Sequence, residues 1–104
     1  MPDPAEQIRH LHEAGFSLET FDRYPKHVAA VRDGCIALLE ITAAGLNMTG
    51  TPGWRMGELM GVLVERSGRQ FFQAKAETRE ASPEMLQALR RFRAELEELL
   101  IRRV

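Results

Sequence analysis

The sequence predicts an α+β fold: a short N-terminal helix, a mainly antiparallel sheet of four to six strands, and a long C-terminal amphipathic helix packed on the sheet. Two observations predict the sheet, because Asp33-Gly34 and Ser67-Gly68 each stand between strand-like runs, as β-hairpin turns do. A third predicts the long helix, because apolar residues recur every three or four positions after Ser82. At 104 residues, the chain is expected to form a single domain over residues 1–104.

The N-terminal helix has clear start and stop signals. Asp3 is a good N-cap, Pro4 suits the first helical position, and Gly15 suits the C-terminal stop. Residues 16–21 then form a possible strand with imperfect alternation. Tyr24-Pro25 ends it, because proline cannot donate to a strand ladder.

Asp33-Gly34 is the strongest local signal, since this pair favours a two-residue type I′ turn. The turn sets a register of four pairs: Arg32–Cys35, Val31–Ile36, Ala29–Leu38 and Val28–Leu39. Both faces of this hairpin are apolar, so both need a cover. A helix can cover one face, and the other requires another helix, a sheet or a second subunit.

The middle of the chain is less regular. Residues 43–53 are rich in Gly and Pro and are expected to be mainly loop, with a short strand at 46–49. Residues 54–62 are ambiguous, because their apolar spacing fits a helix whereas Gly57 and Gly61 argue for strand. We favour a second hairpin, residues 58–66 with 69–76, followed by a linker to the last helix.

The C-terminal helix is predicted to start with Ser82 as N-cap and Pro83 at its first position. Its apolar seam alternates steps of four and three residues, as helices do when they pair across a two-fold axis. The sequence therefore predicts a homodimer, or another protein partner, with this interface: Met85, Leu89, Phe92, Leu96 and Leu99. A helix docked on its own sheet has the same stripe.

Composition excludes some classes of protein. The net charge of −1 provides no global field to attract nucleic acid or an anionic membrane. The single cysteine, and the lack of a signal peptide or long apolar run, favour a cytoplasmic protein without a membrane span. The preference for Arg over Lys is typical of a GC-rich bacterial genome.

No metal or cofactor is expected. His10 and His12 would lie about 200° apart around a helix, so they cannot chelate one metal together. His27 is the third histidine, and no zinc-ligand spacing occurs. The glycines of residues 45–61 fit neither phosphate-loop nor dinucleotide-binding spacing.

Three sets of residues could nevertheless carry chemistry. Cys35 could be a nucleophile or redox sensor if a neighbour lowered its pKa, but an unpaired cysteine is more often a small core residue. Trp54, beside a glycine-rich stretch, could form a ligand wall. The third set is basic and aromatic: Arg90, Arg91 and Arg93, with Arg66, Arg69 and Lys75 beside Phe71 and Phe72.

Nucleic acid is not expected as a partner, because Glu95, Glu97 and Glu98 follow the helix arginines and a solvated ion-paired face explains them. The sequence most favours a non-enzymatic interaction or self-association module. One alternative is a small-ligand- or nucleic-acid-binding module that uses Trp54, Phe71, Phe72 and the helix arginines. The other is a thiol enzyme or redox sensor that uses Cys35. Because no acid–base set is evident, an enzyme is less expected than a binding protein.

Overall fold

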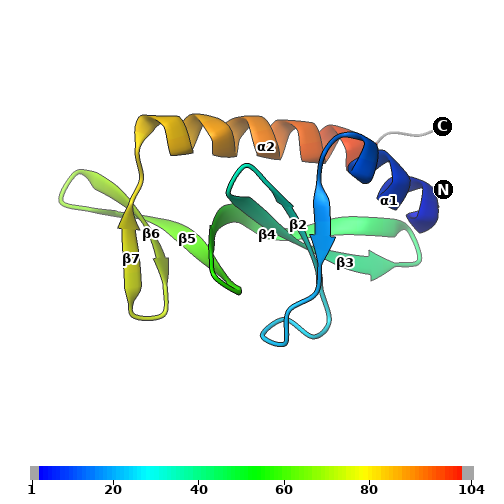
Figure 1. Ribbon diagram of the computed structural model, residues 1–104, viewed down its shortest axis with the longest axis horizontal. Helices are drawn as coiled ribbons and strands as arrows, with labels where there is room; N and C mark the ends of the chain where they lie inside the picture. Colours follow the sequence, from blue (N-terminus) through cyan, green and yellow to red (C-terminus); the bar gives the residue numbers. More distant parts are fainter. Residues whose placement is uncertain (1–2, 102–104) are drawn as a thin grey trace.

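The computed structural model describes residues 3–101 and has the predicted α+β fold (Figure 1). Each strand pairs antiparallel with the next, so the sheet is a meander. The helices are α1 (Pro4–Glu13) and α2 (Pro83–Ile101). The strands are β1 (Ser17–Glu19), β2 (Val28–Arg32), β3 (Cys35–Thr42), β4 (Gly45–Met56), β5 (Leu59–Arg66), β6 (Arg69–Ala74) and β7 (Glu77–Glu80). No helix within residues 3–101 is long and apolar enough to cross a membrane.

The ends of α1 form as their residues predict. The Asp3 carboxylate accepts a hydrogen bond of 3.0 Å from a backbone N–H of the first turn. At the other end, Gly15 has φ +91° and its N–H donates to the His12 carbonyl. The Phe16 N–H donates to the Leu11 carbonyl, which completes a Schellman motif. This motif reverses the chain so that Phe16 and Leu11 enter one core cluster.

The β2–β3 hairpin has the register that Asp33-Gly34 predicts, from Arg32–Cys35 to Val28–Leu39. Asp33 and Gly34 have φ values of +53° and +82°, as a type I′ turn requires. The side chains alternate between two faces. We call the face toward α2 the helix face and the opposite one the outer face.

The sheet has seven strands, so the prediction of four to six was wrong. Much of the predicted loop at 43–53 belongs to β4, which spans twelve residues. Its register with β3 shifts between Ile36 and Leu38, where residues 50–52 form a bulge. The Gly and Pro of this segment therefore interrupt the ladder only locally.

The linker expected before α2 contains β7, whose four residues are all exposed. β7 is an edge strand with no apolar alternation in its sequence, Glu-Thr-Arg-Glu. Charged side chains at a sheet edge discourage pairing with other chains. A charged edge strand therefore has the composition of a linker, and only its pairing with β6 identifies it as a strand.

Residues 54–62 are not helical: they form the end of β4, a turn at Gly57-Glu58 and the start of β5. The hairpin that we favoured is present as β5 and β6, with Val64 opposite Phe71. The glycines that made this segment ambiguous have a steric role. A Cβ on Gly53 would collide with the carbonyl oxygen of Gly61, and one on Gly61 would lie 2.5 Å from the Met56 sulfur. Glycine thus lets β4 and β5 approach closely.

The helix face carries the main core. α2 lies along this face, and α1 lies beside the C-terminal part of α2 (Figure 1). Leu89, Phe92 and Leu96 of α2 are buried there. The Phe92 ring also packs at 58° against that of Phe16, with centroids 5.4 Å apart.

The outer face of β2 and β3 is covered by the connection between β1 and β2, residues 20–27, which Figure 1 shows on the side opposite α2. Phe21 is buried against Ala29, Val31 and Ile36, and Tyr24 packs beside them. A loop with two aromatic residues therefore provides the cover that we expected from another helix, a sheet or a second subunit. Further along the same face, Val62 of β5 is 53% exposed.

Candidate functional site

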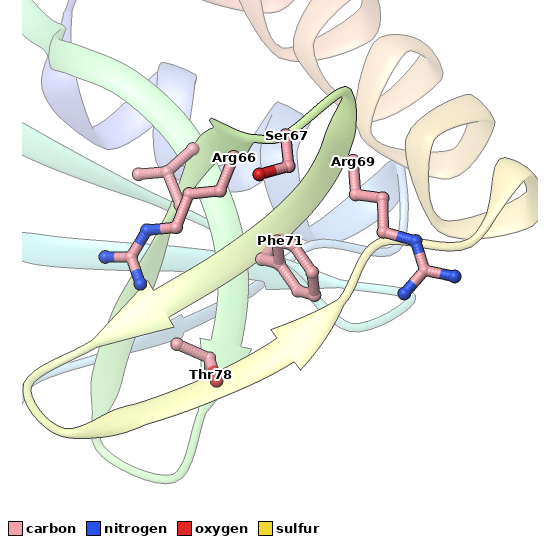
Figure 2. Close-up of a pocket in the computed structure, with 6 residues that line it drawn as sticks. Arg66, Ser67, Arg69, Phe71 and Thr78 are labelled. Atoms are coloured by element: carbon pink, nitrogen blue, oxygen red, sulfur yellow. The ribbon is translucent and has the colours of Figure 1, made fainter.

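Two adjoining hollows lie on the outer face of β5 and β6. The first has a volume of about 290 Å³ and is lined by Val64, Arg66, Ser67, Arg69, Phe71 and Thr78 (Figure 2). The second has a volume of about 220 Å³ and is lined by Arg23, Tyr24, Leu59, Met60, Val62, Gln73, Ala74 and Lys75. The cross-strand pairs Val64–Phe71 and Val62–Gln73 are successive pairs on this face and join the hollows. We call the two hollows together the outer groove.

Strand alternation and one turn place the side chains of the first hollow. Because successive residues of a strand point to opposite faces, Phe71 lies on the outer face while Phe72 enters the core. The Ser67-Gly68 turn, with φ values of +53° and +77°, makes Arg66 and Arg69 a directly opposed pair. Figure 2 shows the Phe71 ring between the two guanidinium groups, with Ser67 and Thr78 on the remaining sides.

The outer groove is basic. Arg66 and Arg69 line its first hollow, and Arg23 and Lys75 its second. All four bases are exposed, and within residues 3–101 none of them forms an ion pair. Among residues 3–101, no Asp or Glu lines either hollow, although Glu80 of β7 pairs with Phe71 on this face.

Arg66 donates a hydrogen bond of 2.9 Å to the Gln73 side-chain oxygen, which leaves its positive charge without a counter-ion. Its neighbour across the strands is another cation, Arg69. Like charges directly opposite one another destabilise a sheet. Residues that break a local rule of this kind often serve a function.

Arg32 occupies the equivalent position before the other hairpin turn and shows what a structural arginine looks like in this fold. Its side chain is 16% exposed, and its guanidinium lies 4.2 Å from the Phe16 ring centroid. It pairs with Glu95 at 2.5 Å and donates to the Ala14 carbonyl. Within the described part of the chain, Arg66 has no comparable packing and no carboxylate partner, so these residues do not explain its charge.

Cys35 lies in the core, on the helix face, with no exposed surface. Burial, with a smaller effect of the Asp33 carboxylate, raises the pKa of this thiol from 9.0 to about 11, although Arg32 acts in the opposite direction. The thiol is therefore protonated near neutral pH. The thiol donates a long hydrogen bond of 3.9 Å to the Asp33 carbonyl oxygen.

The aromatic candidates are divided between the two faces. Trp54 stacks on Phe72 with ring centroids 5.7 Å apart, and Phe72 is fully buried. These two rings form part of the core on the helix face. Phe71 alone of the three reaches the outer groove.

The three arginines of α2 have different surroundings. Arg93 forms an ion pair of 2.9 Å with Glu97, as the i,i+4 spacing predicts. Arg90 and Arg93 border an apolar hollow of about 220 Å³ between α2 and the sheet, together with Leu63 and Leu86. Arg91 is exposed and borders neither that hollow nor the outer groove.

The residues predicted for a dimer interface mostly face the chain's own sheet. Leu89, Phe92 and Leu96 are buried within a single chain, whereas Met85 and Leu99 are only partly buried at the edge of the same cluster. Between Asp3 and Ile101, no group of three or more metal-ligating side chains gathers.

Arg23 and Tyr24 were not recognised from the sequence as site residues. They lie in the 20–27 connection, and Tyr24 is 36 residues from its contact Met60 in β5. The Tyr24 hydroxyl accepts a hydrogen bond of 3.2 Å from the Met60 N–H, which joins this connection to β5. No local pattern could have indicated that contact.

Comparison of the chain with protein-family models, with curated proteins and with solved structures found no match.

Proposed function

We propose that this chain is a non-enzymatic interaction module that binds an anionic partner through the outer groove. One observation carries the proposal. Four bases line two adjoining hollows, no acid lines either of them, and none of the four bases has an ion-pair partner among residues 3–101. In contrast, Arg32 and Arg55 both pair with glutamates.

The groove combines this charge with apolar surface. Val62 is 53% exposed, and Val64 and Phe71 are partly buried beside the arginines. Such a surface can desolvate a ligand while its cations contact the ligand's negative groups. A second copy of this chain fits poorly there, because a two-fold contact would bring like-charged arginines together.

Binding accounts for these features better than thiol chemistry. Cys35 lies on the opposite face of the sheet from the groove, and burial raises its pKa to about 11. A nucleophilic cysteine requires a lowered pKa and access to substrate.

The test is a titration with inorganic tripolyphosphate, in which NMR spectra record the chemical shifts of the backbone amides. We expect the amides of β5 and β6 to shift, and the double variant Arg66→Gln/Arg69→Gln to weaken binding about tenfold or more, because each charged hydrogen bond contributes about 1.5–3 kcal/mol. The matched control is Arg90→Gln/Arg91→Gln, which removes the same charge from exposed positions on α2.

If the control weakens binding as much as the groove variant, the effect is one of net charge. That result, or an absence of shifts in β5 and β6, would refute the proposed function. A loss confined to the α2 variant would instead favour the helix arginines.

A further inference from the structure

We infer that the anionic partner is single-stranded nucleic acid, with one base stacked on Phe71 and the neighbouring phosphates held by Arg66 and Arg69. This inference rests on the proposed function, because it names the class of ligand for the same groove. It departs from our expectation based on net charge, because four basic residues without an ion pair among residues 3–101 gather around one groove. Arg90 and Arg91 on α2 also lack an ion pair within this range.

The position of Phe71 is the first argument. Most large apolar side chains of this sheet point toward α2 or lie under the 20–27 connection, whereas Phe71 is only partly buried on an open face. Figure 2 shows its ring between two guanidinium groups. A ring between cations is the usual arrangement for binding an unpaired base and its backbone, because every base has a π face that can stack.

The hydroxyl groups are the second argument. Ser67 and Thr78 border the hollow on the sides that the arginines leave open (Figure 2). A hydroxyl can both donate and accept, so it can meet the polar edge of any base or a sugar oxygen. Such groups tolerate different bases, and we therefore expect weak sequence preference.

The length of the groove favours a polymer over a single nucleotide. Arg69 begins β6 and Lys75 directly follows its last residue, so the two are six residues apart, which corresponds to about 20 Å along a strand. Arg23 and Tyr24 lie at the Lys75 end. One nucleotide could not reach both ends. A strand of several nucleotides could contact all four basic residues of the groove and stack on the rings of Tyr24 and Phe71.

The partner should be single-stranded, because stacking on Phe71 requires an unstacked base. In a duplex the faces of the bases are already occupied by their neighbours. An anionic peptide would satisfy the arginines equally, but it would make no specific use of the Phe71 ring. The role of Phe71 therefore distinguishes these partners.

The experiment measures fluorescence anisotropy of a labelled ten-residue oligothymidylate, with an abasic oligonucleotide of the same length as the matched probe. The abasic probe has the phosphates but no bases. We expect the wild-type chain to bind oligothymidylate about tenfold more tightly than the abasic probe, and more tightly than duplex DNA or polyglutamate. Oligouridylate should bind like oligothymidylate, because stacking and phosphate contacts do not depend on the sugar.

The variants separate stacking from charge. Phe71→Leu should remove the preference for oligothymidylate while leaving abasic binding unchanged, and Phe71→Tyr should restore the preference. Because single strands release about 0.7 counterions per phosphate contact, four contacts predict a slope of log affinity against log salt near −3. Arg66→Gln/Arg69→Gln should reduce this slope to about half, and Arg90→Gln/Arg91→Gln should leave the slope unchanged. Thermal unfolding of each variant checks that it is folded.

Equal binding of the abasic probe, polyglutamate and oligothymidylate would overturn the inference but leave the proposed anion-binding function standing. An unchanged preference in folded Phe71→Leu would also overturn it. If neither oligothymidylate nor tripolyphosphate binds, both the inference and the proposed function fail.

Discussion

Gln7 illustrates how much a single residue can contribute in this small core. It is 3% exposed and lies on α1 between two other elements. Its side-chain oxygen accepts a hydrogen bond of 2.8 Å from the Leu46 N–H, and its side-chain nitrogen donates one of 3.0 Å to the Leu100 carbonyl. One amide therefore joins α1 to β4 and to the end of α2.

Replacing Gln7 with Ala should lower the free energy of unfolding by about 2–4 kcal/mol, because the Leu46 N–H would be buried without an acceptor. Chemical denaturation measures this loss. The control is Gln87→Ala, an exposed position on α2, for which we expect a change of less than about 0.5 kcal/mol. Similar denaturation midpoints for the two variants would show that Gln7 does not join these elements.

Cys35 should make stability depend on alkaline pH. Its folded-state pKa is raised from 9.0 to about 11, chiefly by burial. The unfolded chain therefore loses the thiol proton first, and the folded state binds more protons across this interval. The contribution of Cys35 is fully present below pH 9 and is lost as pH rises from 9 toward 11.

Because other groups also titrate at alkaline pH, the measurement compares the wild type with Cys35→Ala by denaturation at several pH values. The wild type should lose more stability than the variant between pH 9 and 11. Parallel pH profiles would mean that the thiol is solvated, and fast reaction with a disulfide reagent at pH 7 would restore Cys35 as a reactive-site candidate.

At the scale of elements, the two hairpins have the same turn geometry but different surroundings. Gly34 and Gly68 have φ values of +82° and +77°. A Cβ on Gly34 would lie 2.6 Å from the Trp54 ring, whereas a Cβ on Gly68 would meet nothing within 4 Å. The first turn packs on the core, and the second projects into solvent beside the outer groove.

This difference predicts unequal effects of one substitution. Gly68→Ala should cost about 1–2 kcal/mol, the strain of a left-handed backbone alone. Gly34→Ala should cost about 1–3 kcal/mol more, because the Trp54 ring must also move. Denaturant midpoints of the two variants measure the difference, and equal losses would show that Trp54 does not pack against the first turn.

At the scale of the whole molecule, the protein is elongated, with extents of 44 × 27 × 19 Å, and α2 lies along one face of its sheet (Figure 1). Three residue pairs join β4 to β5, and Phe72 of β6 packs in the same core cluster as Leu89 of α2. Leu96, fully buried on α2, shows that the predicted dimer seam also serves the core. The homodimer itself stays a prediction.

Two substitutions on the seam separate these roles. Leu96→Glu should unfold the chain in any oligomeric state, because it buries a carboxylate in the core. Leu99→Glu should remain folded, since Leu99 is only partly buried, and should dissociate a dimer that uses the edge of α2. Sedimentation at micromolar concentration measures both effects. A wild-type chain that sediments as a monomer would rule out the dimer, and a folded, dissociated Leu96→Glu would place Leu96 in the interface.

Part of the site could be predicted from the sequence. Arg66, Arg69 and Lys75 were recognised as a basic surface beside Phe71, because Ser67-Gly68 and strand alternation bring them together locally. Arg23 and Tyr24 could not be assigned to it, since their place depends on how residues 20–27 fold over the sheet. Nor could the sequence distinguish Arg32 from Arg66, which both precede hairpin turns.

The sequence by itself determined the features that depend on neighbours along the chain: the Asp3 cap, the Gly15 stop, the two hairpin registers and the stripe of α2. Tertiary structure alone decided the continuity of β4, the pairing of β7, the cover over β2 and β3, and which arginines have partners. The physical reason is range. Caps, turns and periodicity act within a few residues, whereas burial and ion pairing depend on segments that meet only after the sheet has formed.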